Sequence, residues 1–381
     1  MKTIQLQLTA DGDTTALERL RGLDADVVLC FGAQGYFRRP GLHAALREAA
    51  PHAAFAGCSS AGEILNSQVH DNTLAVVGVK FAHAGARSAA TTIAGMADSF
   101  GAGARLGAVL PHAGLRHVLV FGTGVHINGS ALVEGLQSTL PPSAQISGGL
   151  AGDGGAFVET FTLADGGCRS DQIVALGLYG ESLAIGNSSV GGWVPFGPAR
   201  RITRCDHNVL YELDGERALN IYKRYLGEYA RDLPSSGLLF PFELLRDNQE
   251  SSGIIRTILG VDDDEGSLTL AGDVIEGGYL KLMHASTERL IDAAEQAALK
   301  LQGLSRKHTG PALALLVSCV GRKLVMGDRV DEEVEAVASV LGTRAAVAGF
   351  YSYGEISASE FVGDCRLHNQ TMTITWMTED V

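Results

Sequence analysis

The sequence predicts an α/β fold of two domains, built from repeated strand–helix–turn–strand units with mixed sheets. One observation is a repeat: Gly57–Ile64 (GCSSAGEI) recurs as Gly349–Ile356 (GFYSYGEI), and a weaker third copy occupies Ser147–Asp153 (SGGLAGD). The other is length, because 381 residues exceed the roughly 250–300 at which a single hydrophobic core stops growing.

The flanks of the three copies also agree. A short β-branched run, which predicts a buried strand, is followed by a glycine-bearing loop, a helix, the motif, and a second strand that an Asx residue opens. The predicted first strands are 27–31, 118–121 and 313–320, the helices 42–50, 131–139 and 332–341, and the residues opening the second strands Asn72, Asp171 and Asn369. Alternating strands and helices favour α/β layers.

The segment between the second and third units has a different character. Gly191–Pro198 is rich in turn formers, Arg200–Leu213 predicts a strand, and Glu216–Glu228 carries apolar residues at helical spacing. We therefore expect a boundary near residue 213, with domains 1–213 and 214–381. Two further elements are predicted, a solvated hairpin tip at Asp262–Gly266 and a long helix over Ser286–Leu304 with Ser286 as its N-cap.

Charge and composition exclude several function classes. With 43 Asp and Glu against 30 Lys and Arg the net charge is −13, which disfavours nucleic acid and anionic membranes as partners. The acidic N-terminus, with Asp11 and Asp13, does not fit a signal peptide, and no apolar run approaches the roughly 20 residues of a membrane span. Six cysteines without a C-x-x-C pair indicate neither a disulfide framework nor a zinc site. We expect a cytoplasmic protein.

The glycine-rich loops predict a ligand crevice. Loops at Gly32–Gly35, Gly122–Gly129 and Cys319–Lys323 each follow a predicted strand, where free backbone N–H groups converge. In the three motif turns, Glu63, Asp153 and Glu355 are expected at equivalent positions. Such carboxylates either lock the turn by accepting backbone N–H groups or contact a ligand, for instance the amine of a small zwitterion whose carboxylate Arg322 holds. The expected ligand-binding residues are Cys58, Ser59, Ser60, Glu63, Gly149, Asp153, Arg322, Tyr351, Tyr353, Glu355 and Asn369.

Catalytic motifs are weak. The loops match neither the P-loop nor the dinucleotide-binding pattern, and no serine triad is evident. An enzyme would have to use Cys58 as a thiolate or the motif carboxylates on a small metabolite, and a purely structural interaction module is a third alternative.

Three histidines stand apart from the rest, namely His126 in a glycine-rich loop, His284 between a strand and a helix, and His368 before the last strand. They are candidate axial ligands if the protein binds haem, which the composition permits without indicating it.

The quoted motifs resemble those of the bacterial FIST proteins over nearly the whole of residues 27–378. The N-terminal part resembles FIST N through Gly57–Ile64, Gly148–Asp153 and Gly192–Pro195, and the C-terminal part resembles FIST C through Cys319–Arg322, Gly349–Ile356 and His368–Thr371.

The resemblance implies a small-ligand sensor and not an enzyme, with amino acids or related metabolites as ligands. Some stand-alone members bind haem b, sense nitric oxide and act on a histidine kinase or a cyclic-di-GMP enzyme. The resemblance therefore allows a haem-based nitric oxide sensor that signals through such a partner, or a metabolite sensor without haem, and it leaves the oligomeric state open.

Overall fold

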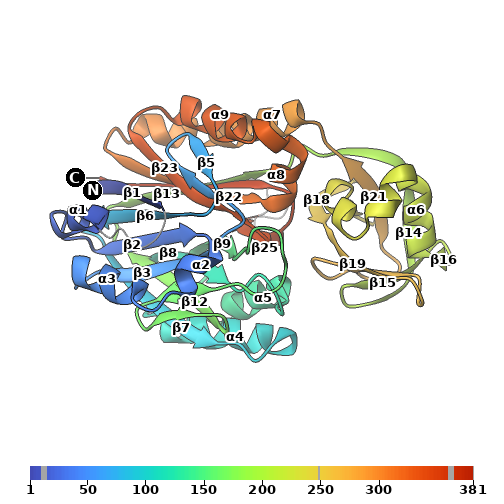
Figure 1. The fold of residues 1–381 in the computed structure, drawn as a ribbon, viewed down its shortest axis with the longest axis horizontal. Helices are drawn as coiled ribbons and strands as arrows, with labels where there is room; N and C mark the ends of the chain where they lie inside the picture. The colour runs from blue at the N-terminus through green and yellow to red at the C-terminus, as the bar shows by residue number, and fades with distance from the viewer. Residues whose placement is uncertain (10–14, 248, 359–363, 381) are drawn as a thin grey trace.

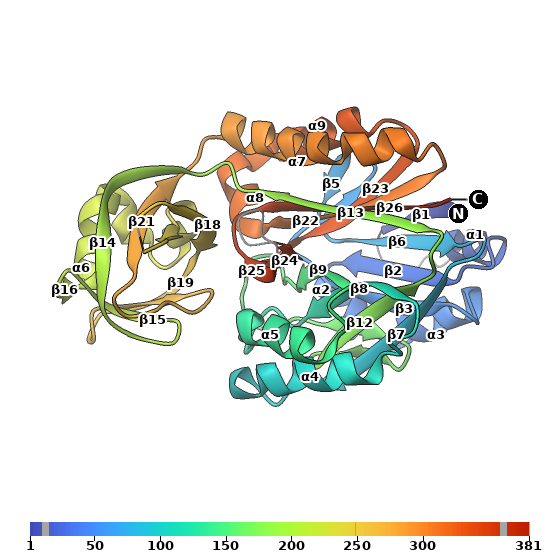
Figure 2. The same ribbon diagram turned by 180° about the vertical axis from the view of Figure 1, so that it is seen from behind.

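The computed structural model describes residues 1–9, 15–247, 249–358 and 364–380, arranged as two bodies (Figure 1). The larger one, here called the body, contains both chain termini and is built from residues before 191 and after 286. The smaller one, here called the module, spans residues 194–284. It is inserted between two strands of one body sheet, and the strand entering it continues almost directly from the body (Figure 2).

The body consists of three copies of one folding unit, which confirms the predicted repeat and the α/β class with mixed sheets. The first contains β1 (Lys2–Thr9), α1 (Glu18–Arg21), β2 (Val27–Gly32), α2 (Gln34–Arg38), α3 (Leu42–Ala49), β3 (Ala54–Ser59) and β6 (Thr73–Lys80). The second contains β7 (Gly85–Thr92), α4 (Ser99–Val109), β8 (Leu115–Gly122), α5 (Gly129–Thr139), β9 (Gln145–Leu150) and β12 (Gln172–Tyr179). The third contains β13 (Leu183–Val190), α7 (Thr287–Lys307), β22 (Ala312–Cys319), α8 (Val320–Met326), α9 (Asp331–Leu341), β23 (Ala345–Ser352) and β26 (Met372–Glu379).

Strand order is the same in all three sheets, β1-β6-β2-β3, β7-β12-β8-β9 and β13-β26-β22-β23. The last two strands in each order are parallel and the other pairs antiparallel. Parallel pairing needs a crossover, and the predicted helices supply it. The central strands are buried on both faces, as in β2 and β22, which explains their unbroken apolar sequences.

Each unit gives a short hairpin to the sheet of another unit. The hairpins are β4 (Glu63–Leu65) with β5 (Gln68–His70), β10 (Thr162–Ala164) with β11 (Gly167–Arg169), and β24 (Gly354–Ala358) with β25 (Cys365–His368). They extend the sheets at β23, β3 and β9 respectively. The three units therefore form a closed ring around a shared core, in which Phe31, Phe121 and Phe350 have ring centroids 4.8–6.1 Å apart.

The first glycine of every motif copy has a packing cause. Gly57, Gly148 and Gly349 lie opposite Cys30, Val120 and Leu316 in the parallel pairs. A Cβ atom at any of the three would overlap the carbonyl oxygen of its partner. The recurring glycine is thus required by close approach of two strands.

The module is one curved antiparallel sheet that packs against α6 (Ala218–Leu226) (Figure 2). Its strands are β14 (Val194–Asp206), β15 (Val209–Leu213), β16 (Glu216–Arg217), β17 (Phe242–Leu245), β18 (Ser251–Arg256), β19 (Ile258–Asp262), β20 (Ser267–Leu270) and β21 (Tyr279–His284). The short helices η3 (Gly227–Asp232) and η4 (Ser235–Leu239) follow α6. The boundary expected near residue 213 lies inside this module.

The middle segment also tests individual predictions. The helix at 216–228, the acidic tip between β19 and β20, and the Ser286 cap of α7 are confirmed. The single strand over 200–213 is wrong, because β14 and β15 form a hairpin that turns at His207. His207 has φ 49°, a left-handed conformation that short polar sequences such as Asp206–Asn208 accommodate in turns.

None of the helices in the described ranges combines the length and apolar character that crossing a bilayer requires.

Candidate functional site

The three motif turns meet, as the repeat predicts. The backbone N of Ala61 donates to Tyr351 O at 2.8 Å, and the N of Tyr351 donates to Gly62 O at 2.8 Å. The third turn joins through Gly152, whose N donates to Ser59 O at 2.9 Å. The turns therefore bond directly to one another.

Two motif carboxylates make identical sets of hydrogen bonds. Glu63 Oε1 accepts from Ser60 Oγ at 2.5 Å, and its Oε2 accepts from the N and Oγ1 of Thr73 at 3.0 and 2.8 Å. Glu355 is bonded in the same way to Ser352 Oγ at 2.7 Å and to the N and Oγ1 of Thr371 at 3.0 and 2.9 Å. Each glutamate ties its turn to the start of the next strand. Burial raises the pKa of Glu355 to about 7 and also raises that of Glu63.

Asp153 differs from the two glutamates, so its expected equivalence is wrong. Its carboxylate accepts from the backbone N of Phe157, Val158 and Glu159 at 2.8, 2.8 and 3.0 Å, and from the hydroxyl of Tyr353. It thereby closes its own loop and does not bond to the following strand. The second motif is one residue shorter, which places an acidic residue where the other copies have glycine.

Arg322 holds a carboxylate, but that carboxylate belongs to Glu333. Its Nε and Nη2 donate to Glu333 Oε2 at 3.0 and 2.7 Å, and both side chains are fully buried. Nη2 also donates to Leu290 O at 2.9 Å, and Nη1 donates to Gly191 O. These carbonyls belong to the two chain segments that lead into and out of the module. Tyr351 completes the group by donating to Glu333 Oε1 at 2.6 Å.

The remaining residues expected to bind ligand are also packed inside the body. Cys58 is fully buried, and burial raises the pKa of its thiol well above the ordinary value. Ser59 Oγ accepts from Phe161 N at 2.9 Å, Gly149 packs against Val317, and Asn369 is 1% exposed. None of the expected ligand-binding residues lines either of the two cavities described below, and their ligand contacts stay predictions.

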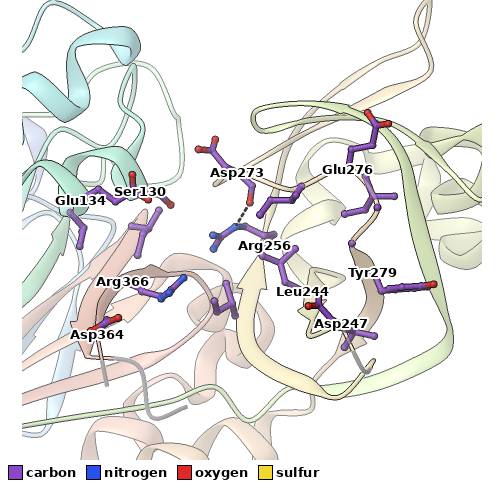
Figure 3. A pocket seen from close by; sticks show the side chains of 18 of the residues that line it. Ser130, Glu134, Leu244, Asp247, Arg256, Asp273, Glu276, Tyr279, Asp364 and Arg366 are labelled. Carbon is purple, nitrogen blue, oxygen red and sulfur yellow. Dashed lines mark hydrogen bonds between the residues drawn. The ribbon is translucent and has the colours of Figure 1, made fainter. Parts of the chain in front are cut away.

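A cavity of about 620 Å³ lies where the module meets the body (Figure 3). The body contributes α5 and β25 to its wall, and the module contributes β17, β18 and the turn before β21. The volume falls within the roughly 300–1,000 Å³ typical of small-ligand pockets, which often lie between domains.

Arg256, at the end of β18, presents a buried cation to this cavity. The residue is 6% exposed, and its Nε and Nη1 donate to the backbone oxygens of Asp273 and Ile255, both at 3.2 Å. Across the described ranges of the chain, no carboxylate forms an ion pair with it. Burial lowers the pKa of Arg256 to about 10, so the group remains charged at neutral pH.

Arg366, on β25, approaches the same cavity from the body. It is exposed, and Figure 3 shows its guanidinium and that of Arg256 pointing toward each other. Burial, together with the positive charges of these two arginines, lowers the pKa of His368 to about 4. Three basic side chains therefore gather where β18 lies against β25.

A second cavity, of about 290 Å³, lies on the other face of β18. Side chains alternate along a strand, so Ile255 faces this cavity while Ile254 and Arg256 face the larger one. Its wall includes Trp193, Met283 and His368.

The structure does not bring the three candidate haem ligands together at either cavity, and haem binding stays a prediction. His126 and His284 are exposed, and His368 lines only the smaller cavity, where its Nε2 already bonds to Ser357 O at 3.2 Å. That cavity is at the lower limit for small organic ligands and has several polar walls, which does not fit a porphyrin.

Sequence reasoning missed both arginines of the cavity. Arg256 follows Gly253–Ile255 and precedes Thr257–Ile258, so it is a lone cation in a run that otherwise predicts a buried strand. Such a residue is a signal in itself, because an arginine is almost never fully buried without a partner. Arg366 carries no comparable local signal.

Two family models match the chain in succession, the FIST N domain over residues 26–216 and the FIST C domain over residues 218–358. An uncharacterized protein of Methanocaldococcus jannaschii is 26% identical over 263 residues, which are 62% of this chain and 48% of that protein. The chain thus spans about half the length of this curated relative.

A crystal structure of a cyanuric acid hydrolase from A. caulinodans aligns over 100% of this chain and 99% of its own, at a TM-score of 0.38 and 9% identity. A likeness this distant carries no inference about activity. The family matches cover most of the residues. The chain therefore belongs to the FIST family, whose domains are sensory domains that bind small ligands in signal-transduction proteins.

Proposed function

We propose that the protein is a small-ligand sensor whose ligand occupies the cavity between the body and the module. The observation that carries this is a ligand-sized cavity at the junction of two bodies, with the buried Arg256 aimed into it. The family supplies the sensory class, and amino acids or related metabolites are the ligands that we expect first.

The signal in this proposal is a change in how the module sits on the body. Side-chain hydrogen bonds that join the two across the junction include Asn128 Nδ2 to the Asp273 carboxylate at 3.2 Å and Gln370 Nε2 to Leu238 O at 2.8 Å. A ligand that touches both walls stabilises one arrangement over others and shifts the population toward it. A partner such as a histidine kinase or a cyclic-di-GMP enzyme would then recognise that arrangement.

Catalysis is not part of the proposal. The enzyme alternative depends on a reactive Cys58 or on free motif carboxylates, whereas the thiol is buried with a raised pKa and both glutamates accept three hydrogen bonds each. Of the three candidate haem ligands only His368 lines one of the two cavities, and its Nε2 is already bonded to Ser357 O, so a hemin titration followed by its visible spectrum tests the haem-based version separately.

A thermal-shift screen with amino acids and related metabolites tests the proposal. A true ligand at a hundred times its Kd stabilises the protein by about 2.7 kcal/mol. The variant Ser130→Phe, which fills the cavity from α5, should abolish the shift. Ser138→Phe, on the exposed side of the same helix, is the matched control and should leave it intact. Equal shifts in both variants would place the ligand elsewhere.

A further inference from the structure

We propose that the ligand of this cavity is an organic anion with an apolar body, held between Arg256 of the module and Arg366 of the body. This inference rests on the proposed function, because it names the chemical class of the ligand that occupies the same cavity. Three features of the cavity restrict the chemical class of its ligand: two cations on facing walls, an apolar lining, and the carboxylates around it.

Arg256 carries a buried positive charge that has no ion-pair partner among the described residues. Arg256 is 6% exposed, so its guanidinium has lost most of its hydration, and backbone oxygens at 3.2 Å replace part of that hydration without supplying a full negative charge. The charge of the Asp273 carboxylate offsets part of the effect of burial on the pKa of Arg256, but this carboxylate is bonded to the amide of Asn128 and forms no ion pair with the arginine. Gly272 helps to seat the arginine, because a Cβ there would come within 2.8 Å of Arg256 Nε. The site is thus built to hold a cation whose anion comes from outside.

Arg366 supplies the second positive charge at the cavity. Its guanidinium faces that of Arg256, and in the described part of the chain it forms no ion pair of its own. Like charges repel across the junction, and the two arginines add to burial, the larger cause, in lowering the pKa of His368. An anion between the two arginines would turn this repulsion into two charge-assisted hydrogen bonds.

The rest of the cavity wall includes apolar and acidic side chains. Leu244, Ile254 and Ile275 line the cavity, and Ile275 is 77% exposed although it is large and apolar. A ligand with an apolar body would cover these side chains. Five carboxylates line the cavity as well, and they disfavour a polyphosphate or other highly charged anion; they belong to Glu134, Asp247, Asp273, Glu276 and Asp364. A singly charged carboxylate with an apolar body suits the two arginines and the apolar walls, and it carries the least charge that the lining carboxylates would repel.

Such a ligand couples binding to the position of the module. Arg256 belongs to the module and Arg366 to the body. An anion that bonds to both is therefore bound tightly only in the arrangement that places the two arginines opposite each other. Both arginines are then needed for affinity and for the change of arrangement.

Three probes of equal length test the charge rule, hexanoate, hexanamide and hexylammonium, with inorganic phosphate as the anion that lacks an apolar body. Binding is measured by ligand-observed NMR on the full chain at low ionic strength. Hexanoate should bind at least about tenfold more tightly than hexanamide, as expected for a hydrogen bond to a charged group. Hexylammonium should bind most weakly.

Arg366→Gln and Arg256→Gln should each weaken hexanoate by about tenfold to a hundredfold and leave hexanamide unchanged. Arg366 is exposed, so its variant tests the inference even if Arg256→Gln fails to fold. Arg231→Gln, at an exposed arginine of the module outside the cavity, is the control and should have no effect.

The inference is overturned if hexanamide or hexylammonium binds as well as hexanoate, if phosphate outcompetes hexanoate, or if Arg366→Gln leaves hexanoate binding intact. If no probe binds while a neutral metabolite gives a shift that Ser130→Phe abolishes, the anion inference fails and the proposed function stands. If no metabolite gives such a shift, the proposed function fails as well.

Discussion

Replacing Arg322 by methionine should destabilise the protein strongly, because the buried Glu333 carboxylate would lose its counter-ion. In the structure the guanidinium donates twice to Glu333 Oε2 and once each to the carbonyl oxygens of Leu290 and Gly191. Methionine leaves all of these acceptors without that donor. Breaking a fully buried ion pair by removing one partner costs about 3–5 kcal/mol.

Urea unfolding of Arg322→Met in a Trp193→Phe background measures this cost, since Trp376 in the body is then the single fluorescent tryptophan. The double variant Arg322→Met/Glu333→Leu should recover much of the loss, because the uncompensated charge is removed. Arg329→Met, which breaks exposed pairs with Glu288 and Glu332, is the control and should change little. A loss below about 1 kcal/mol for Arg322→Met would refute the reasoning about buried ion pairs at this site.

Three further predictions concern the motifs. Gly349→Ala should destabilise the protein by about 1–3 kcal/mol or more in the same assay, because the added methyl group overlaps Leu316 O. Gly303→Ala on α7 is the control, since the methyl group has free space there and the variant should be neutral or stabilising. Equal effects of the two substitutions would contradict the packing argument. Glu355 has a pKa of about 7 in the folded protein against an ordinary value of 4.5. Its contribution to the free energy of unfolding is therefore full below pH 4.5 and is lost as the pH rises through 7. Stability of the wild type relative to Glu355→Gln should therefore fall by about 3 kcal/mol over that window, and parallel pH profiles would argue against it. Cys58 should resist iodoacetamide in the native protein and react after denaturation, as followed by peptide mass spectrometry; rapid native labelling would revive the enzyme alternative.

The repeated units could be predicted because their signals are local. A β-branched run such as Val27–Phe31 is buried on both faces, and Gly57 recurs because a parallel partner leaves no room for a side chain. The glutamates of the motif, Glu63 and Glu355, act as the turn-locking alternative describes. Each of these features is decided within one unit of the chain.

The exchange of hairpins between units could not be read from the sequence. The residues of β4 form an ordinary short strand, and nothing in them specifies pairing with β23 rather than with a strand of their own unit. The break at His207 differs, because Asp206–Asn208 is a local polar turn signal that the strand-forming residues on both sides outweighed in the prediction. Pairing partners are set by how whole units pack, which is a property of the assembled ring.

The cavity was missed for a related reason. Its walls come from residues 130–137, 244–279 and 364–367, which are brought together by insertion of the module and by the exchange of β25. The loop position of Arg322 predicts that it binds a ligand carboxylate, but Arg322 already forms an ion pair with Glu333. Arg256 has no such partner in the described ranges. Chemistry at a site depends on which charges remain unpaired after folding.

A crystal structure with a ligand from the thermal-shift screen would test the central claim most directly. We predict ligand density in the cavity between α5 and β18, in contact with Arg256. Density among the motif turns around Ser60 and Ser352, with the junction cavity empty, would contradict the account.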